Sequence, residues 1–106
     1  MANGVSIILT TVANDEHAAE LGDMLLAKNL AACIQEIPIR SRYRWKGASQ
    51  CDAEVLMLIK TAHDRVTAVV EAIRGNHRYE LPEILVLQSS SGLAEYIAWV
   101  HAETRG

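Results

Sequence analysis

Apolar residues follow two different spacings along the chain, and the order in which these spacings alternate limits the folds that it can adopt. Residues 5–12, VSIILTTV, form a continuous apolar and β-branched run, which is typical of a strand buried on both faces. The next segment begins with Asn14, a residue that favours helix N-caps, and its apolar residues recur three or four positions apart. We therefore expect a strand over residues 5–12 and then a helix that ends near Lys28 or Asn29.

Two long extended segments are predicted for the middle of the chain. Residues 31–45, AACIQEIPIRSRYRW, contain Pro38, which indicates an edge strand or a bulge because proline cannot donate a backbone hydrogen bond. Residues 51–61, CDAEVLMLIKT, form the second strand, and the intervening KGAS forms the turn. In the resulting long hairpin we expect Cys51 to lie opposite Trp45.

The second half of the chain repeats the alternation of spacings. Apolar residues at positions 66, 69, 70 and 73 predict a helix, and Gly75 provides its stop signal. Residues 83–88, EILVLQ, predict a strand, and residues 92–103 carry another helical stripe that includes Leu93 and Tyr96. The order is β-α-β-β-α-β plus a C-terminal helix. This order predicts an α+β, ferredoxin-like fold in which helices cover one face of an antiparallel sheet.

Composition and charge narrow the classes of function. A chain of 106 residues that is 50% hydrophobic can form one domain, which we expect to span residues 1–106. Its net charge of −3 provides no basic field for nucleic acid or anionic lipid. The sequence has no apolar run of membrane-spanning length and no P-loop, HExxH or CxxC motif. We expect a cytoplasmic protein that is not an enzyme and binds neither nucleic acid nor membrane.

The predicted sheet leaves one of its faces without helices. Its strands nevertheless carry apolar residues in both directions of the pleat, as SIILTTV, VLMLIK and ILVLQ show. A second copy of the chain is the simplest cover for such a face. We therefore predict a homo-oligomer whose interface is built from the uncovered sheet face and the long hairpin.

Residues 75–84, GNHRYELPEI, contain more side chains able to bind a ligand than a connector usually has. His77 follows a helix stop, where its imidazole either binds a metal ion or caps the preceding carbonyls. Glu80 and Glu83 offer oxygens to a hard cation, although a solvated loop accounts better for Glu80, and Glu83 could instead pair with Lys60 or an arginine. The sequence leaves a metal site and a structural turn as alternatives.

The first strand of the predicted hairpin alternates arginines with hydroxyl and aromatic residues. The arginine row consists of Arg40, Arg42 and Arg44. These side chains lie on one face, where they bind phosphate or carboxylate, keep an edge strand soluble, or pair with Asp52 and Glu54 across the hairpin. The other face carries Tyr43 and Trp45, two of the few aromatic residues in the chain, and we interpret it as an interface.

Several motifs occur together in a characteristic order. They are TTV at residues 10–12, LAACIQEIP at 30–38, SRYRWKG at 41–47, EVLMLIKT at 54–61, HRYELPEI at 77–84 and YIAWV at 96–100. In this combination the chain resembles the CutA divalent-cation-tolerance family over nearly its whole length. The resemblance implies a homotrimer similar to the PII-type signalling proteins, with hairpins that reach neighbouring subunits. It also implies an association with copper and other divalent cations.

The chain differs from the family at the positions to which copper binding is attributed. That copper site combines a cysteine near the end of the first strand with two adjacent histidines, and this chain has Thr10, Asn76 and His77 at those positions. Without the thiolate we expect no high-affinity copper site of that type. His77 and Glu83 are left as candidate metal ligands for Cu(II) or another divalent cation, and no cofactor is expected to be needed for folding.

The resemblance further implies a ligand-binding cleft between subunits. Its expected lining is Arg42, Tyr43, Trp45, Glu54, Lys60, Tyr79, Glu80 and Glu83. Two functions therefore stand as alternatives. The chain is either a trimeric cytoplasmic protein that binds divalent cations weakly or through altered ligands, or a PII-like regulatory or scaffold module that binds a small anion or a partner protein in this cleft.

Overall fold

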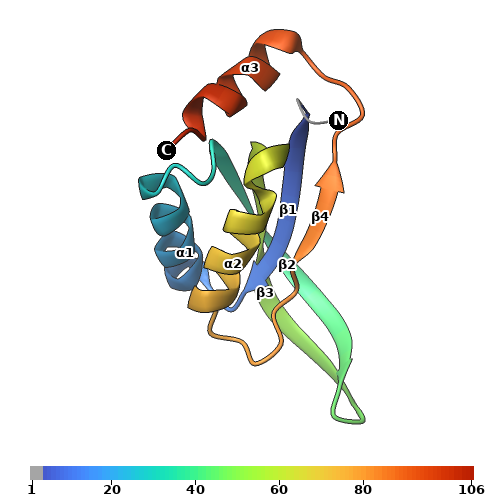
Figure 1. Ribbon diagram of the computed structural model, residues 1–106. Helices are drawn as coiled ribbons and strands as arrows, with labels where there is room; N and C mark the ends of the chain where they lie inside the picture. The colour runs from blue at the N-terminus through green and yellow to red at the C-terminus, as the bar shows by residue number, and fades with distance from the viewer. Residues whose placement is uncertain (1–3) are drawn as a thin grey trace.

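The computed structural model describes residues 4–106, in which a four-stranded antiparallel sheet carries two helices on one face (Figure 1). The strands are β1 (Val5–Val12), β2 (Cys33–Trp45), β3 (Ala48–Ala62) and β4 (Leu85–Gln88), and the helices are α1 (Asp15–Ala27), the 3-10 helix His63–Arg65, α2 (Val66–Asn76) and α3 (Ala94–Glu103). The strand order β2-β3-β1-β4 confirms the ferredoxin-like prediction with its additional C-terminal helix. No helix in this described part is long and apolar enough to cross a membrane.

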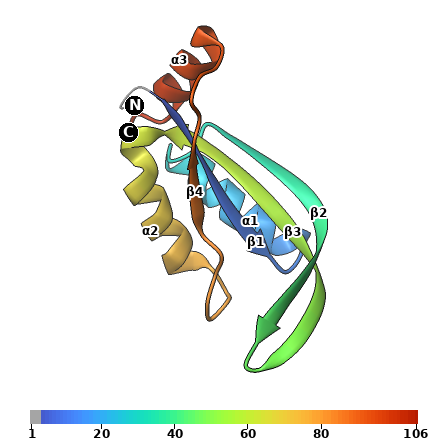
Figure 2. The same cartoon turned by 90° about the vertical axis from the view of Figure 1, so that its right-hand side faces the viewer.

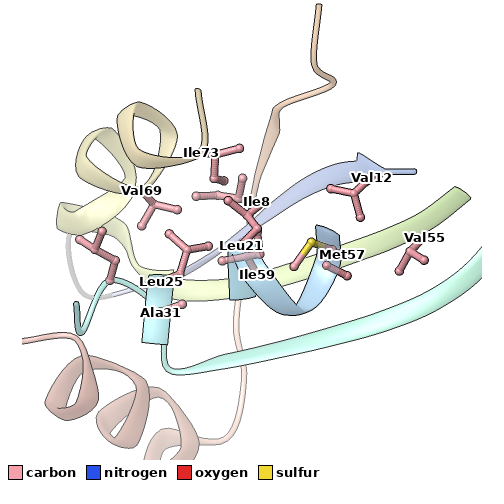
Figure 3. Packing of buried hydrophobic residues seen from close by; sticks show 12 residues of the cluster. Ile8, Val12, Leu21, Leu25, Ala31, Val55, Met57, Ile59, Val69 and Ile73 are labelled. Carbon is pink, nitrogen blue, oxygen red and sulfur yellow. The ribbon is translucent and has the colours of Figure 1, made fainter. Parts of the chain in front are cut away.

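α1 and α2 pack on the same face of the sheet and enclose the core (Figure 3). Ile8 of β1 and Met57 of β3 point from the sheet toward Leu25 of α1 and Ile73 of α2, and all four side chains are fully buried. Truncating a core side chain of this size to alanine typically costs about 2–5 kcal/mol. The core therefore holds β1 and β3 firmly, and these two strands support the groove described below.

Local signals explain where several elements begin and end. The side chain of Asn14 accepts a hydrogen bond from the backbone N–H of His17 at 3.0 Å, which caps α1 as predicted. Asn29 has a φ of 55°, the left-handed conformation that commonly follows a helix C-terminus. Pro38 lies in β2, which is an edge strand. β4 is shorter than predicted, since its pairing with β1 begins only at Leu85.

The β2–β3 hairpin extends beyond the sheet as a two-stranded arm (Figure 2). Its turn consists of Lys46 and Gly47, whose φ angles are 51° and 81°. Positive φ values at both positions are those of a type I′ turn, whose twist matches that of the strands. Because this turn has only two residues, Cys51 lies opposite Arg42 and not opposite Trp45. The predicted register of the hairpin was wrong.

The corrected register changes which side chains share a face of the arm. Asp52 lies opposite Ser41, and Glu54 lies opposite Ile39. Side chains alternate between faces along a strand, so both carboxylates share a face with Tyr43 and not with the arginine row. The predicted pairing of the arginines with Asp52 and Glu54 is therefore wrong.

α3 lies across one end of the sheet (Figure 1). Val100 is its buried residue, and Arg105 beyond the helix donates two hydrogen bonds to Asp64, at 2.7 and 2.8 Å. The Arg105 guanidinium lowers the pKa of Asp64 to about 2. Leu93 and Tyr96 of the predicted apolar stripe are exposed, so the chain itself covers only part of that stripe.

The sheet face opposite α1 and α2 exposes apolar side chains. On the edge strand β4, Leu85 and Leu87 point to this face and are 56% and 50% exposed, and Ile37 on the opposite edge strand is also exposed there. Val86 between them pairs with the core residue Ile8, so it points to the helical side, where it is 41% exposed. A contiguous apolar surface rimmed by polar residues usually marks an interaction site.

Two fully buried threonines differ in their hydrogen bonding and provide a matched test of the core. Within residues 4–106 the Thr10 hydroxyl has no hydrogen-bond partner, whereas the Thr61 hydroxyl donates to the Leu30 carbonyl at 2.7 Å. We expect Thr10→Val to raise the free energy of unfolding by about 1 kcal/mol and Thr61→Val to lower it by about 1–2 kcal/mol. Urea unfolding at one fixed protein concentration measures both. Equal losses of stability in the two variants would contradict this prediction.

Candidate functional site

A groove of about 970 Å³ lies between the hairpin arm and the segment that connects α2 to β4. The arm and this segment run close to each other at the lower end of the molecule in Figures 1 and 2. We define the groove by Thr11, residues 41–45, Glu54 and residues 78–85. It brings together seven of the eight residues predicted for the cleft, namely Arg42, Tyr43, Trp45, Glu54, Tyr79, Glu80 and Glu83.

Lys60 is the predicted cleft residue that does not border the groove. It lies opposite Ile7 and Cys33, and its ammonium is 5.7 Å from the centre of the Tyr96 ring on α3. Because Lys60 is six residues along β3 from Glu54, the two are separated by about 20 Å. A pair between Glu83 and Lys60 is also absent from the described residues.

His77 uses both of its ring nitrogens within the chain. Its Nδ1 accepts a hydrogen bond from the backbone N–H of Tyr79 at 3.1 Å, so the ring proton lies on Nε2, which donates to the Thr11 carbonyl at 2.8 Å. These bonds attach the connecting segment to the end of β1. The geometry supports the structural alternative for His77, and direct metal binding, which stays a prediction, would require one of these bonds to break.

Two tyrosines donate hydrogen bonds to carboxylates beside the groove. The Tyr79 hydroxyl donates to Glu54 at 2.6 Å, and the Tyr43 hydroxyl donates to Asp52. Burial and the Glu54 carboxylate raise the pKa of Tyr79, and the hydrogen bond to Asp52 raises the pKa of Tyr43. Both phenols therefore stay protonated at neutral pH and act as hydrogen-bond donors.

The charged side chains of the groove have mixed signs and are mostly exposed. Glu80 lies 3.9 Å from Lys46 at the tip of the arm, and Arg78 pairs with Glu20 of α1. Glu83 has no ion-pair partner among residues 4–106. Three His, Cys, Asp or Glu side chains placed to hold a metal ion are likewise not found in that range. The groove thus offers oxygen atoms and positive charges without a preassembled metal centre.

Asp52 and Thr11 were not predicted as site residues. Thr11 contributes its backbone carbonyl, for which the sequence carries no signal. For Asp52 the sequence does carry a signal. The pair Lys46 and Gly47 ends in a glycine directly before the second strand, which indicates a two-residue hairpin turn. The register that follows from such a turn places Asp52 on the face of Tyr43.

The family model of the CutA1 divalent ion tolerance protein matches residues 6–103. The chain belongs to the CutA1 family. It is 42% identical to protein CutA of Mus musculus over 101 residues, which cover 94% of this chain and 57% of the mouse protein. It is 36% identical to the divalent-cation tolerance protein CutA of Escherichia coli (strain E24377A) over 106 residues, which cover 98% of this chain and 95% of that protein. The family prediction is confirmed.

Solved CutA structures share the fold of this family member. The crystal structure of CutA1 from Oryza sativa has a TM-score of 0.92 at 35% identity, covering 96% of this chain and 94% of that one. CutA from Xylella fastidiosa has a TM-score of 0.93 at 34% identity, covering 96% of this chain and 99% of that one. The chain spans little more than half the length of two curated relatives, 56% of the rice protein and 57% of the mouse protein.

The two tyrosine–carboxylate pairs are expected to differ in strength. Tyr79 is half-buried and Tyr43 is exposed, so Tyr79→Phe should lower the free energy of unfolding by about 1 kcal/mol and Tyr43→Phe by less than about 0.5 kcal/mol. Denaturant unfolding of both variants measures the difference. Equal effects would mean that the Tyr79–Glu54 bond does not help to fix the connecting segment.

Proposed function

We propose that this CutA1 family member is a cytoplasmic homotrimer that contributes to divalent-cation tolerance by binding cations weakly in the groove. The carboxylates of Glu54, Glu80 and Glu83, which border one groove, carry this proposal. Oxygen ligands suit hard divalent cations, and they bind Cu(II) less tightly than thiolate and imidazole sets do. The E. coli and Pectobacterium atrosepticum relatives are named divalent-cation tolerance proteins, which fits this role. The proposed role is binding and not catalysis.

The state of the groove explains why the proposed affinity is low. Glu54 already accepts a hydrogen bond from Tyr79, and Glu80 is exposed near Lys46. A cation must draw flexible side chains together and compete with these contacts, which costs conformational entropy. Thr10 supplies no thiolate, Asn76 supplies no imidazole, and both nitrogens of His77 are engaged, so none of the three ligands of the family copper site is available without a rearrangement.

Calorimetric titration of the chelator-stripped protein with Cu(II), Zn(II) and Mn(II) tests the cation site. We expect saturable binding that Glu80→Gln/Glu83→Gln weakens about tenfold, since two charged ligands are lost. His77→Gln, which keeps a hydrogen-bonding side chain, should have little effect. Glu71→Gln/Glu103→Gln makes the same change of charge on exposed helical positions and serves as the control. Loss of binding in His77→Gln alone would assign the site to the imidazole and contradict the proposal.

The homotrimer is proposed because a single chain leaves apolar strand surface uncovered. β4 exposes apolar residues on both of its faces, and the α3 residues Leu93 and Trp99 are exposed as well. A closed ring of three copies would cover these surfaces while the arm of each subunit reaches its neighbour. In such a ring each groove would lie beside another subunit.

Charge substitution on β4 should disrupt this assembly. We expect Leu87→Arg to convert a species with the mass of three chains into smaller or unfolded species, because the guanidinium would have to be desolvated in the interface. Leu26→Arg replaces a residue of similar exposure, 44%, on the helical layer and should leave the mass unchanged. Sedimentation velocity at micromolar concentration measures both. A wild-type protein that sediments as a monomer would contradict the homotrimer.

A second candidate function rests on Arg42. This arginine borders the groove, is exposed and has no ion-pair partner among the described residues, so it is free to bind a small anion or a carboxylate of a partner protein. The calorimetric experiment distinguishes the candidates. Absence of any saturable metal binding, together with phosphate binding that is insensitive to chelators, would favour this PII-like alternative.

A further inference from the structure

The arginine row is a charged surface of the arm that extends beyond the groove, since Arg42 and Arg44 border the groove and Arg40 does not. Across the arm, its three members lie opposite neutral residues: Arg40 opposite Ala53, Arg42 opposite Cys51 and Arg44 opposite Ser49. All three arginines are exposed, and none of them forms an ion pair within residues 4–106. Three aligned and unneutralised guanidinium groups stand out in a chain whose net charge is −3.

We propose that the arginine row binds an extended acidic segment of a partner protein. Alternate residues of a strand recur every ~6.6 Å, so the row presents three guanidinium groups over about 13 Å. An extended peptide with a carboxylate at every second position has the same repeat. Each carboxylate can then meet one guanidinium, whose planar fork binds carboxylates through two parallel hydrogen bonds.

The distribution of aromatic residues favours an acidic peptide over single-stranded nucleic acid. Proteins that bind single strands combine cationic grooves with aromatic rings on which the bases stack. On this arm Tyr43 and Trp45 share a face with Asp52 and Glu54, whereas the arginines lie on the other face. A base beside the row would have no ring to stack on. The row is also short for a single-strand site, since one OB fold covers about 4–16 nucleotides and the row offers three cations.

The length of the row is limited on its inner side. Glu36 lies four residues before Arg40 in β2 and therefore on the same face, opposite Met57. Its carboxylate would repel a longer acidic segment. The expected ligand is therefore a short stretch with about three alternating carboxylates, lying along residues 40–44.

Fluorescence anisotropy with labelled nine-residue peptides in low-salt buffer tests the proposal on the intact protein. One probe carries glutamate at alternate positions, and the other has the same composition with its glutamates in one block. We expect the alternating peptide to bind about threefold more tightly than the block peptide. Arg40→Gln/Arg44→Gln should weaken binding of the alternating peptide about fivefold, the scale expected for two exposed charge pairs.

The control variant Lys28→Gln/Arg74→Gln removes the same two positive charges from exposed positions outside the arm and should bind like the wild type. If the control variant bound the alternating peptide as weakly as the arginine variant does, or if the wild type bound both peptides equally well, net charge alone would explain the binding. Either result would overturn the proposal. Tighter binding of oligothymidylate than of the alternating peptide would assign the row to nucleic acid and also overturn it. A changed sedimentation mass of the arginine variant would show that the row contacts another copy, which is a third contradicting outcome.

Discussion

The two-residue turn at Lys46 and Gly47 is the constraint on which the arrangement of the arm depends. It sets the register of β2 against β3, and the register decides which side chains share a face. One extra residue in the turn would exchange the faces, place the carboxylates beside the arginines and separate Tyr43 from Asp52. The observed turn instead divides the arm into a face on which Tyr43 is hydrogen-bonded to Asp52 and a cationic face whose arginines lie opposite neutral residues.

The other wall of the groove is attached to the same sheet by His77. This side chain bonds to the Thr11 carbonyl at the end of β1 and to the backbone of Tyr79, and Tyr79 in turn bonds to Glu54 on β3. The connecting segment is therefore tied to two central strands, although it contains no regular secondary structure between α2 and β4. Because the core under those strands is closely packed, these bonds fix the separation of the two walls at the inner end of the groove.

The order of elements could be predicted because strand and helix periodicities are local properties of the sequence. The run at residues 5–12 and the helix after Asn14 were placed almost without error. Features that depend on distant parts of the chain were harder to predict. The predicted register of the hairpin was wrong because the predicted turn was too long. A register that is wrong by an odd number of residues moves every side chain of one strand to the opposite face relative to its partner strand. Lys60 was assigned to the cleft because the family resemblance implies a cleft between subunits; within one chain it lies far along β3 from the groove, and its place in such a cleft stays a prediction. The apolar stripe of α3 was recognised from the sequence, but a periodic pattern does not show what covers it. Of the residues of α3, Val100 is the one that the chain itself buries.

The edge strand β4 has a consequence for the fate of a newly made chain. No strand among residues 4–106 pairs with its outer edge, and its side chains are apolar on both faces, so in a free subunit it offers a template on which any extended polypeptide could add. The longer such a strand remains uncovered, the greater is the chance that the chain aggregates through it. For the proposed homotrimer, the concentration of subunits at the moment of synthesis would decide between productive pairing and aggregation. A cell would have reason to produce this chain in quantities that allow copies to meet quickly.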